Sequence, residues 1–290
     1  MSAAEAASGE GPLAMICGGG TLPLAVADSV AARGRKVLLF PLRGAADPAA
    51  FAGREHTWVH LGQFGTVARI ARAQGCRDIV CLGSVVRPSL WQLRPDLFTL
   101  KVLPQVARAF RGGDDHLLSS VGRVIESHGF RMLGAHEVAP EILVPAGTLG
   151  AVAPSERDHV DIALGLEYLR AAGPFDVGQA VVVADRHVLA VEAAEGTDAM
   201  LTRVAQLRAS GRIRAPAGSG VVVKAPKPGQ DRRFDLPSVG PKTVDGVKRA
   251  GLAGMAVAAG ETIVAEPEAL IAAADRAGIF IVGVPAGSAR

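Results

Sequence analysis

The sequence is poor in residue types on which several protein classes depend. Only three of its 290 residues are cysteines, and their irregular spacing excludes a disulfide framework or a cysteine zinc site. Phenylalanine, tryptophan and tyrosine make up 4% of the chain, too few for the aromatic platforms of a single-strand nucleic-acid binder. The seven histidines show no HExxH or similar metal-binding spacing.

Long apolar runs and a strong charge of one sign are also lacking. No apolar stretch reaches the roughly 18 residues needed to span a bilayer. The first residues lack the basic and apolar regions of a signal peptide. The net charge is only +3 and the cations are dispersed, so no nucleic-acid arm is present. We therefore expect a cytoplasmic protein that does not bind nucleic acid.

The residues that are abundant favour an α/β fold. Hydrophobic residues make up 49% of the chain, and its 35 glycines suit close packing of helices on a sheet. Apolar runs typical of strands alternate with helical spacing in the first half, beginning with a strand, helix and strand at 13–17, 22–33 and 37–42. Later strands are predicted at 58–61, 78–82 and 130–134. The alternation predicts a Rossmann-like, mostly parallel sheet.

A second domain is predicted after a stretch without periodicity. Residues 139–154 carry prolines and glycines but no helical or strand-like pattern. We place a Rossmann-like N-terminal domain at 1–140 and a second, distinct α/β domain at 141–290. The C-terminal domain would contain the most unusual segment of the chain, residues 224–243.

A glycine-rich turn, Gly18-Gly19-Gly20-Thr21, lies between the first predicted strand and its helix. Glycines let the backbone approach an anion, and a helix N-terminus supplies free N–H groups. Pro23 stands where a dinucleotide fingerprint requires its third small residue, and no acidic residue follows the second strand. The turn therefore predicts phosphate or nucleotide contact rather than NAD binding. A close-packed turn without a ligand is the alternative.

Residues 224–243 combine prolines, lysines, arginines and two aspartates after an apolar run. Prolines fix the backbone, so the charges would be held in place. Asp231 and Asp235, with Glu192 and Glu195 elsewhere, make a credible Mg²⁺ environment, because carboxylates beside a phosphate need a divalent metal between them. A solvated surface loop is the alternative for the segment. Simple helix capping is the alternative for the acidic residues around Thr197.

Segments throughout the chain together resemble one family, the UDP-2,3-diacylglucosamine pyrophosphatases of the LpxI type from lipid A biosynthesis. The matching segments are 18–23, 83–85, 94–96, 113–115, 192–198 and 224–244. The most specific is Lys-Ala-Pro-Lys-Pro-Gly-Gln-Asp with Asp-Leu-Pro downstream. The resemblance implies Mg²⁺-dependent hydrolysis of UDP-2,3-diacylglucosamine to UMP and 2,3-diacylglucosamine 1-phosphate (lipid X). It also implies attack of water on the β-phosphorus, two α/β domains and a homodimer.

The chemistry of that reaction assigns a role to each candidate residue. The predicted catalytic residues are Asp231, Asp235, Lys224, Lys227 and Gln230. The predicted ligands of Mg²⁺, for which Mn²⁺ is a substitute, are Asp231, Asp235, Glu192 and Glu195. The predicted substrate-binding residues are Gly18, Gly19, Gly20, Thr21, Gly83, Ser84, Gly196 and Thr197.

The lipid substrate implies peripheral contact with the cytoplasmic face of the inner membrane. An apolar groove for the acyl chains is expected near 90–100. Two other functions stay open at this point. One is a Rossmann-type NAD(P)-dependent oxidoreductase, and the other is a nucleotide-binding regulator without catalytic activity.

Overall fold

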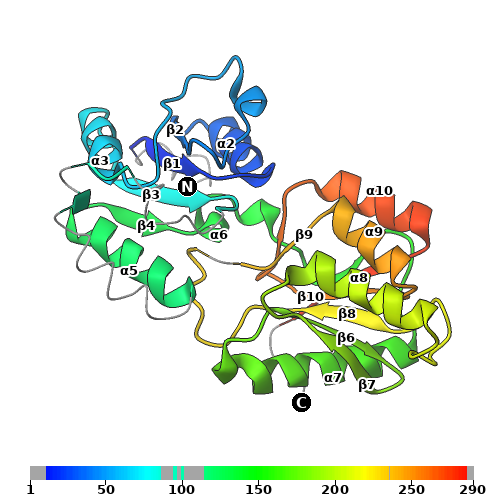
Figure 1. Cartoon of the computed structure of the whole chain (residues 1–290). Coiled ribbons are helices and arrows are strands. Elements are labelled where there is room, and N and C mark those ends of the chain that lie inside the picture. Colours follow the sequence, from blue (N-terminus) through cyan, green and yellow to red (C-terminus); the bar gives the residue numbers. More distant parts are fainter. Residues whose placement is uncertain (1–10, 86–93, 97–98, 101–113, 235, 286–290) are drawn as a thin grey trace. The chain divides into compact units, whose positions relative to one another are not determined.

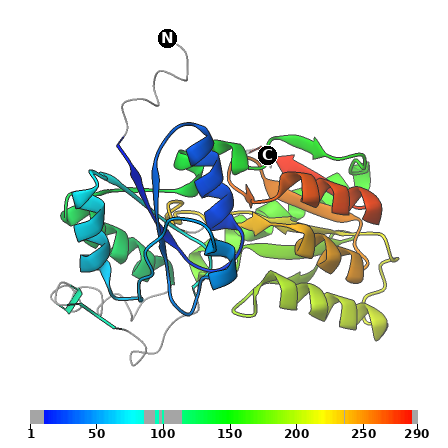
Figure 2. The ribbon, with the colours of Figure 1, turned by 90° about the horizontal axis from the view of Figure 1, so that it is seen from above.

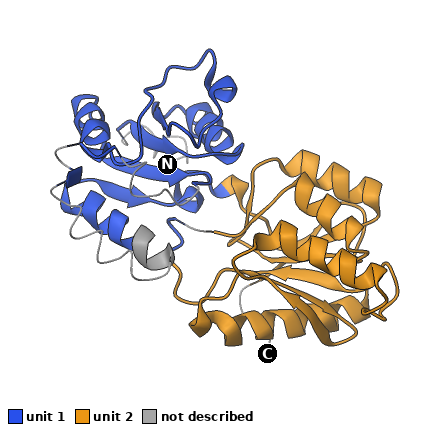
Figure 3. Cartoon of the chain, viewed as in Figure 1, with its two compact units in different colours: residues 1–140, 231–235 blue, residues 141–230, 236–290 orange. Residues whose placement is uncertain are grey.

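The computed structural model describes residues 11–85, 94–96, 99–100, 114–234 and 236–285. The chain divides into two compact units, residues 1–140 with 231–235, and residues 141–230 with 236–290 (Figure 3). Each unit has its own sheet, which confirms the predicted α/β class with a mostly parallel first sheet. Residues 231–235 pack with the first unit, although the sequence analysis placed them in the second domain.

The first unit is built on an open, parallel sheet of four strands in the order β2-β1-β3-β4. Its strands are β1 (Leu13–Cys17), β2 (Val37–Pro41), β3 (Asp78–Leu82) and β4 (Arg131–Leu133). Its helices are α2 (Leu22–Ala32), η2 (Pro48–Phe51), α3 (Phe64–Ala73), α5 (Asp114–Ser127) and α6 (Ala135–Val138). Helix α2 lies on one side of the sheet, and α3 and α5 lie on the other (Figures 1 and 2).

The strand order of the first unit creates a ligand-binding position. From β1 the chain moves outward to β2, and it then returns to place β3 on the other side of β1. Open α/β sheets bind ligands at such a switch point, outside the carboxyl ends of the strands. The segments that leave β1 and β3 at this edge begin with Gly18 and Gly83, both predicted to contact substrate.

Residues 58–61, predicted as a further strand, form only one isolated bridge, from Val59 to Leu42 just after the edge strand β2. The Thr57 N–H donates to the Leu39 carbonyl at 2.9 Å, and the Val59 N–H donates to the Pro41 carbonyl at 3.1 Å. Pro41 has no N–H to donate in return, so the ladder is interrupted there. The strand prediction for this segment is therefore wrong, although the segment lies along the sheet.

The second unit contains a mixed six-stranded sheet in the order β5-β12-β10-β8-β6-β7. Its strands are β5 (Gly147–Leu149), β6 (Ala180–Ala184), β7 (His187–Val191), β8 (Val221–Lys224), β10 (Gly254–Ala258) and β12 (Phe280–Val284). Its helices are η4 (Pro140–Ile142, which begins at the boundary), α7 (Glu156–Ala172), η5 (Gly173–Phe175), α8 (Gly196–Ala209), α9 (Pro241–Arg249) and α10 (Pro267–Ala277). Strands β8, β10 and β12 are parallel, whereas β5 and β6 run antiparallel to their neighbours.

Helices cover both faces of this sheet (Figure 1). Successive strand side chains point to opposite faces, so Val181 and Val183 pack with α7 while Val182 packs with α8, α9 and α10. Helix α7 begins at a capping box, in which the Ser155 hydroxyl accepts the Asp158 N–H and the Asp158 side chain accepts the Ser155 N–H.

The segment 224–243 is not one loop. Lys224 ends β8, and residues 231–234 form a turn that packs with the first unit. Strand β9 (Ser238–Val239) then pairs in parallel with β11 (Ile263–Val264), and α9 begins at Pro241. The expected acyl groove near 90–100 lies largely outside the described residues. Within the described ranges, no helix combines the length and apolar character needed to cross a membrane.

Candidate functional site

Two predicted substrate-binding turns meet at the carboxyl edge of the first sheet. The Gly19 N–H donates to the Ser84 carbonyl at 2.8 Å, and the Ser84 N–H donates back to the Gly19 carbonyl at 3.0 Å. A β-carbon at Gly18 would lie 2.6 Å from the Ser84 carbonyl oxygen, and one at Gly83 would lie 2.6 Å from the Gly19 carbonyl oxygen. The structure therefore brings these predicted residues together and explains why glycine is needed at 18 and 83.

The next two residues lead into the N-terminus of α2. Gly20 has a φ of +91° with open space where a β-carbon would stand. Thr21 precedes the helix without a side-chain capping bond, and the first turn of α2 contains no acidic residue. Backbone N–H groups at such a helix end favour an anion, through their unsatisfied donors and the helix dipole. This end of α2 fits a phosphate group.

In the second unit, Glu192 joins several predicted residues. Its side chain is 9% exposed and accepts the Gln179 N–H at 2.8 Å and the Thr197 hydroxyl at 2.7 Å. Gly196 begins α8 with a φ of +78°. Each Glu192 oxygen accepts one protein donor, so the carboxylate ties the start of β6 to the start of α8. Each oxygen keeps a lone pair, so metal ligation by Glu192 stays a prediction.

Gln230 extends the same group of hydrogen bonds. Its side-chain oxygen accepts the Gln179 side-chain amide at 3.1 Å and the Lys227 N–H at 3.0 Å. The Lys227 ammonium lies 2.5 Å from the Asp176 carboxylate, and the Lys224 ammonium donates to the Ser238 carbonyl at 3.0 Å. Both ammonium groups are thus held by protein oxygens. The predicted residues Lys227, Gln230 and Glu192 thus lie in one network.

Glu195 has a different partner from Glu192. Its carboxylate lies 2.6 Å from the Arg203 guanidinium at the surface of α8. Hydrogen bonds from its own backbone N–H and from Arg203 lower the pKa of Glu195. Exposed ion pairs of this kind contribute little to stability. These contacts are typical of a charged residue at the surface of a helix.

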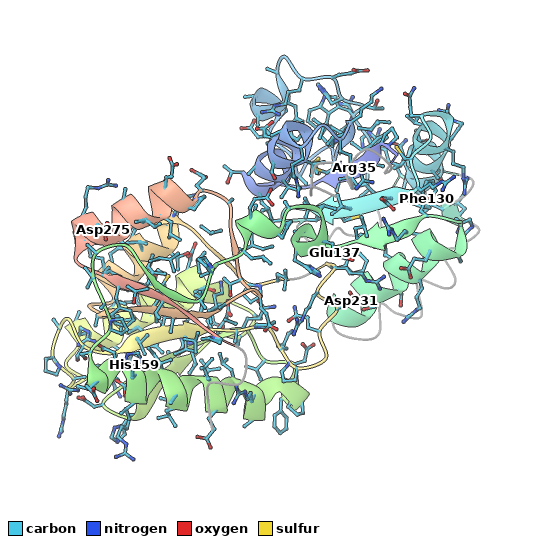
Figure 4. All side chains as sticks on the ribbon, turned by 180° about the vertical axis from the view of Figure 1, so that it is seen from behind. Arg35, Phe130, Glu137, His159, Asp231 and Asp275 are labelled. Atoms are coloured by element: carbon cyan, nitrogen blue, oxygen red, sulfur yellow. The ribbon has the colours of Figure 1, made fainter. Side chains whose placement is uncertain are left out.

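Asp231 opens the tight turn that packs with the first unit (Figure 4). The Phe234 N–H donates to the Asp231 carbonyl at 3.1 Å, and the Asp231 Oδ1 atom accepts the Arg233 N–H at 3.1 Å. Aspartate is favoured at the first position of a turn because its side chain can accept this second N–H. The local sequence Asp-Arg-Arg-Phe therefore forms the turn by itself.

The Arg233 guanidinium forms a bidentate pair with the same carboxylate. Its Nε atom lies 2.9 Å from Oδ1 of Asp231, and its Nη2 atom lies 2.8 Å from Oδ2. A further nitrogen of Arg233 lies 2.5 Å from Glu126 on α5. Hydrogen bonding from Arg233 is the main cause of a pKa below the usual range for Asp231, and positive charge on His136 acts in the same direction. Asp231 is therefore held ionised.

The described carboxylates bear on the predicted Mg²⁺ site. Among the described residues, no three His, Cys, Asp or Glu side chains gather as a metal site. Asp235 lies outside the described residues. Asp231 uses Oδ1 for two donors and Oδ2 for one, so Oδ2 keeps a lone pair. Mg²⁺ commonly takes only one or two carboxylates together with substrate phosphates. Asp231 fits a site of that kind but not one closed by protein ligands alone.

Comparisons with known proteins identify the family. A model of the LpxI N-terminal domain matches residues 12–142, and a model of the LpxI C-terminal domain matches residues 145–282. The chain is also 46% identical over 275 residues to the UDP-2,3-diacylglucosamine pyrophosphatase LpxI of Caulobacter vibrioides, covering 94% of this chain and 97% of that protein. The chain belongs to the LpxI family.

One solved structure found by its shape adds nothing to this assignment. The glycinamide-RNase-transformylase T of Mycobacterium tuberculosis is 14% identical, with a TM-score of 0.23, and the match covers 63% of this chain and 43% of that one. A likeness at this level supports no argument about the LpxI-family fold or its chemistry.

Sequence reasoning missed several residues around the candidate site of this LpxI-family chain. Gln179 joins Glu192 to Gln230, and Glu126 and Arg233 hold Asp231 in place. The only local signal was the position of Arg233 two residues after Asp231, which suits an Asx-type turn. Nothing in the sequence places Glu126 beside Arg233, because 107 positions separate them.

Proposed function

We propose that this chain hydrolyses the pyrophosphate of UDP-2,3-diacylglucosamine in lipid A biosynthesis, yielding UMP and lipid X. One observation carries the proposal, namely the 46% identity over nearly the whole length of a pyrophosphatase named for that substrate. The relative and this chain align over 97% and 94% of their lengths, so the proposal concerns the whole reaction and not a shared domain alone.

The geometry of the first unit is compatible with binding a pyrophosphate. The uncapped N-terminus of α2 offers N–H groups at the carboxyl edge of the sheet. Ionised Asp231 belongs to the same unit. We propose that Asp231 and Asp235 are the catalytic carboxylates. An ionised carboxylate can orient a water molecule and accept its proton as that water attacks phosphorus.

The second unit supplies cations and an amide. Lys224 and Lys227 are proposed to neutralise charge on the phosphate oxygens, and Gln230 is proposed to orient a phosphate or sugar oxygen. The bond from Gln179 to Gln230 and the bond from the Lys227 N–H fix the orientation of the Gln230 amide. Gln230 therefore presents its NH₂ group away from these two donors.

A requirement for Mg²⁺, replaceable by Mn²⁺, is part of the proposal. When bound, the ion would neutralise charge on the non-bridging oxygens of the substrate. Asp231 is the described residue that fits as its protein ligand, and Asp235 is proposed beside it. We also propose a homodimer and contact with the inner membrane surface, since the acyl chains of the substrate reside in a bilayer. Sedimentation and binding to lipid vesicles test these two points.

The decisive assay is product analysis with purified protein. Incubation with UDP-2,3-diacylglucosamine in ¹⁸O-labelled water, followed by mass spectrometry, identifies both products and the phosphorus that was attacked. We expect ¹⁸O in lipid X, as attack on the β-phosphorus requires. Label in UMP would contradict that attack, and the absence of both products would contradict the function and favour a nucleotide-binding regulator. EDTA should stop turnover, and added Mg²⁺ should restore it.

Variants test the carboxylates. Asp231→Ala and Asp235→Ala should each lower kcat by roughly 10²–10⁴-fold, the range for loss of a general acid–base group. Asp28→Ala is the matched control, because Asp28 is an exposed aspartate of the same unit that pairs with Arg54. Full activity in both site variants would remove Asp231 and Asp235 from the mechanism.

A further inference from the structure

The turn 231–234 is held in the first unit by more than the ion pairs at Arg233. Phe234 packs against the apolar cluster formed by α3, α5 and the sheet. A β-carbon at Gly122 of α5 would lie 2.7 Å and 2.9 Å from two ring atoms of Phe234. Real β-carbons do not approach so closely, so the ring occupies the space that the missing side chain of Gly122 leaves.

A second close contact lies on the other side of the turn. A β-carbon at Gly134, which precedes α6, would lie 3.0 Å from the Cα atom of Arg233. The backbone of the turn therefore passes against Gly134 while Phe234 sits against Gly122. Arg233 meanwhile joins Glu126, one helical turn after Gly122, to the carboxylate of Asp231. Three kinds of contact thus fix one turn.

We infer that Phe234 and Gly122 dock the turn 231–234 onto α5, and that Arg233 is a positioning residue that orients the Asp231 carboxylate for the reaction. The docking follows from the packing alone, whereas the role in the reaction rests on the proposed function. A bidentate guanidinium fixes both oxygens of a carboxylate in one plane. The remaining lone pair on Oδ2 is therefore directed by Arg233 and not by free rotation of the Asp231 side chain.

The docking predicts that the effect of Gly122→Ala on stability has the opposite sign to the one expected for an exposed helix position. Alanine stabilises the interior of a helix more than glycine does, so Gly122→Ala should stabilise α5 if no other residue packs on that position. With Phe234 in place, Gly122→Ala should instead lower the thermal midpoint by about 3–10 °C, as expected for overpacking. In a Phe234→Ala background the same substitution should leave the midpoint unchanged or raise it. Such a double-mutant cycle isolates the contact between the two residues.

Tryptophan fluorescence can follow the unfolding of the first unit alone. Both tryptophans of the chain, Trp58 and Trp91, belong to residues 1–140. Ser127→Ala, on the exposed face of α5, is the control for a small change on the same helix. An equal effect of Gly122→Ala in both backgrounds would overturn the docking, and this result does not depend on any activity.

Kinetics then connect the orientation with the reaction. Arg233→Gln should lower kcat by about 10–100-fold, the usual loss when a residue supporting a catalytic group is removed, with KM changed less than about two-fold. Arg233→Lys should recover part of kcat, because lysine keeps the charge but cannot form the bidentate pair. A folded Arg233→Gln protein with unchanged kcat would overturn the orienting role of Arg233. An inactive wild-type protein that still shows the change of sign for Gly122→Ala would overturn only the proposed reaction.

Discussion

Replacing Asp78 should weaken the first unit without altering its chemistry. Asp78 begins β3, and its side chain is only 6% exposed. It accepts a hydrogen bond from Arg35, whose side chain is 9% exposed. It also accepts two hydrogen bonds from Arg131, at 2.8 Å and 3.0 Å. Asp78 lies at the amino end of β3, the opposite end from Gly83, where the substrate-binding turns meet.

The expected loss of stability depends on how deeply each of the two arginines is buried. Removing one partner of a buried pair costs about 3–5 kcal/mol, because a charge remains uncompensated. Arg131 is 61% exposed, so water can replace its bond, which is worth at most about 1 kcal/mol. Arg35 keeps a bond to the Gly11 carbonyl at 3.0 Å. For Asp78→Asn we therefore expect a loss of about 3 kcal/mol, or about 9–12 °C in the midpoint of a unit of this size.

The pH dependence gives a second test. Burial raises the pKa of Asp78, but the hydrogen bonds from Arg131 and Arg35 outweigh it, so the pKa is lowered. A carboxylate with a lowered folded-state pKa stabilises the fold above its unfolded value near 3.9 and loses this contribution as the pH falls further. The difference between wild type and Asp78→Asn should thus be full at pH 7 and shrink below about pH 4.

Unfolding is measured by tryptophan fluorescence during heating or in urea, with Arg131→Gln as the matched control. That variant removes only the exposed partner, so it should cost about 1 kcal/mol or less. Turnover per folded molecule should be unchanged in both. The reasoning would be refuted if Asp78→Asn were within about 0.5 kcal/mol of wild type, or no more costly than Arg131→Gln.

Three further substitutions have defined expected outcomes. Gly83→Ala should lower both stability and substrate affinity, since its β-carbon would meet the Gly19 carbonyl oxygen at 2.6 Å; calorimetry and nucleotide titration check this. Asp161→Asn should cost about 2–3 kcal/mol in urea unfolding, because the 1% exposed carboxylate accepts both N–H groups of the turn 185–186, at 3.1 Å and 2.7 Å. Glu192→Ala should leave the Gln179 N–H without its acceptor, and it should therefore lower the thermal midpoint even in the presence of EDTA.

Much of the fold could be predicted because its signals are local. The glycine turn after β1 was predicted from four neighbouring residues and leads into α2 as expected. The spacing of Ser155 and Asp158 likewise supplies the capping box of α7, and Asp185 and Arg186 form the turn between β6 and β7 with positive φ, 53° and 62°. In each of these features a few neighbouring residues supply both the conformation and its hydrogen bonds.

The rest depended on partners far away in the sequence or on single prolines. Pro41 interrupts the ladder to 58–61, although the apolar run there resembles a strand. Pro241 is the first residue of α9 and not part of the preceding loop, because proline is tolerated in the first helical turn. Asp231 was predicted to be important, yet no pattern near it indicates that Phe234 packs on Gly122.

The division of the first unit into two stretches has a consequence for its synthesis. Its first stretch ends at Pro140 and its second begins at Asp231, so about 90 residues of the other unit are translated in between. At about 5–20 residues per second, this takes roughly 5–20 s. During that interval the nascent first unit displays the surface over Gly122 without its Phe234 ring. Folding of the first unit therefore finishes only after most of β6, α8 and β8 has left the ribosome, and a fragment 1–140 expressed alone would keep that apolar surface exposed.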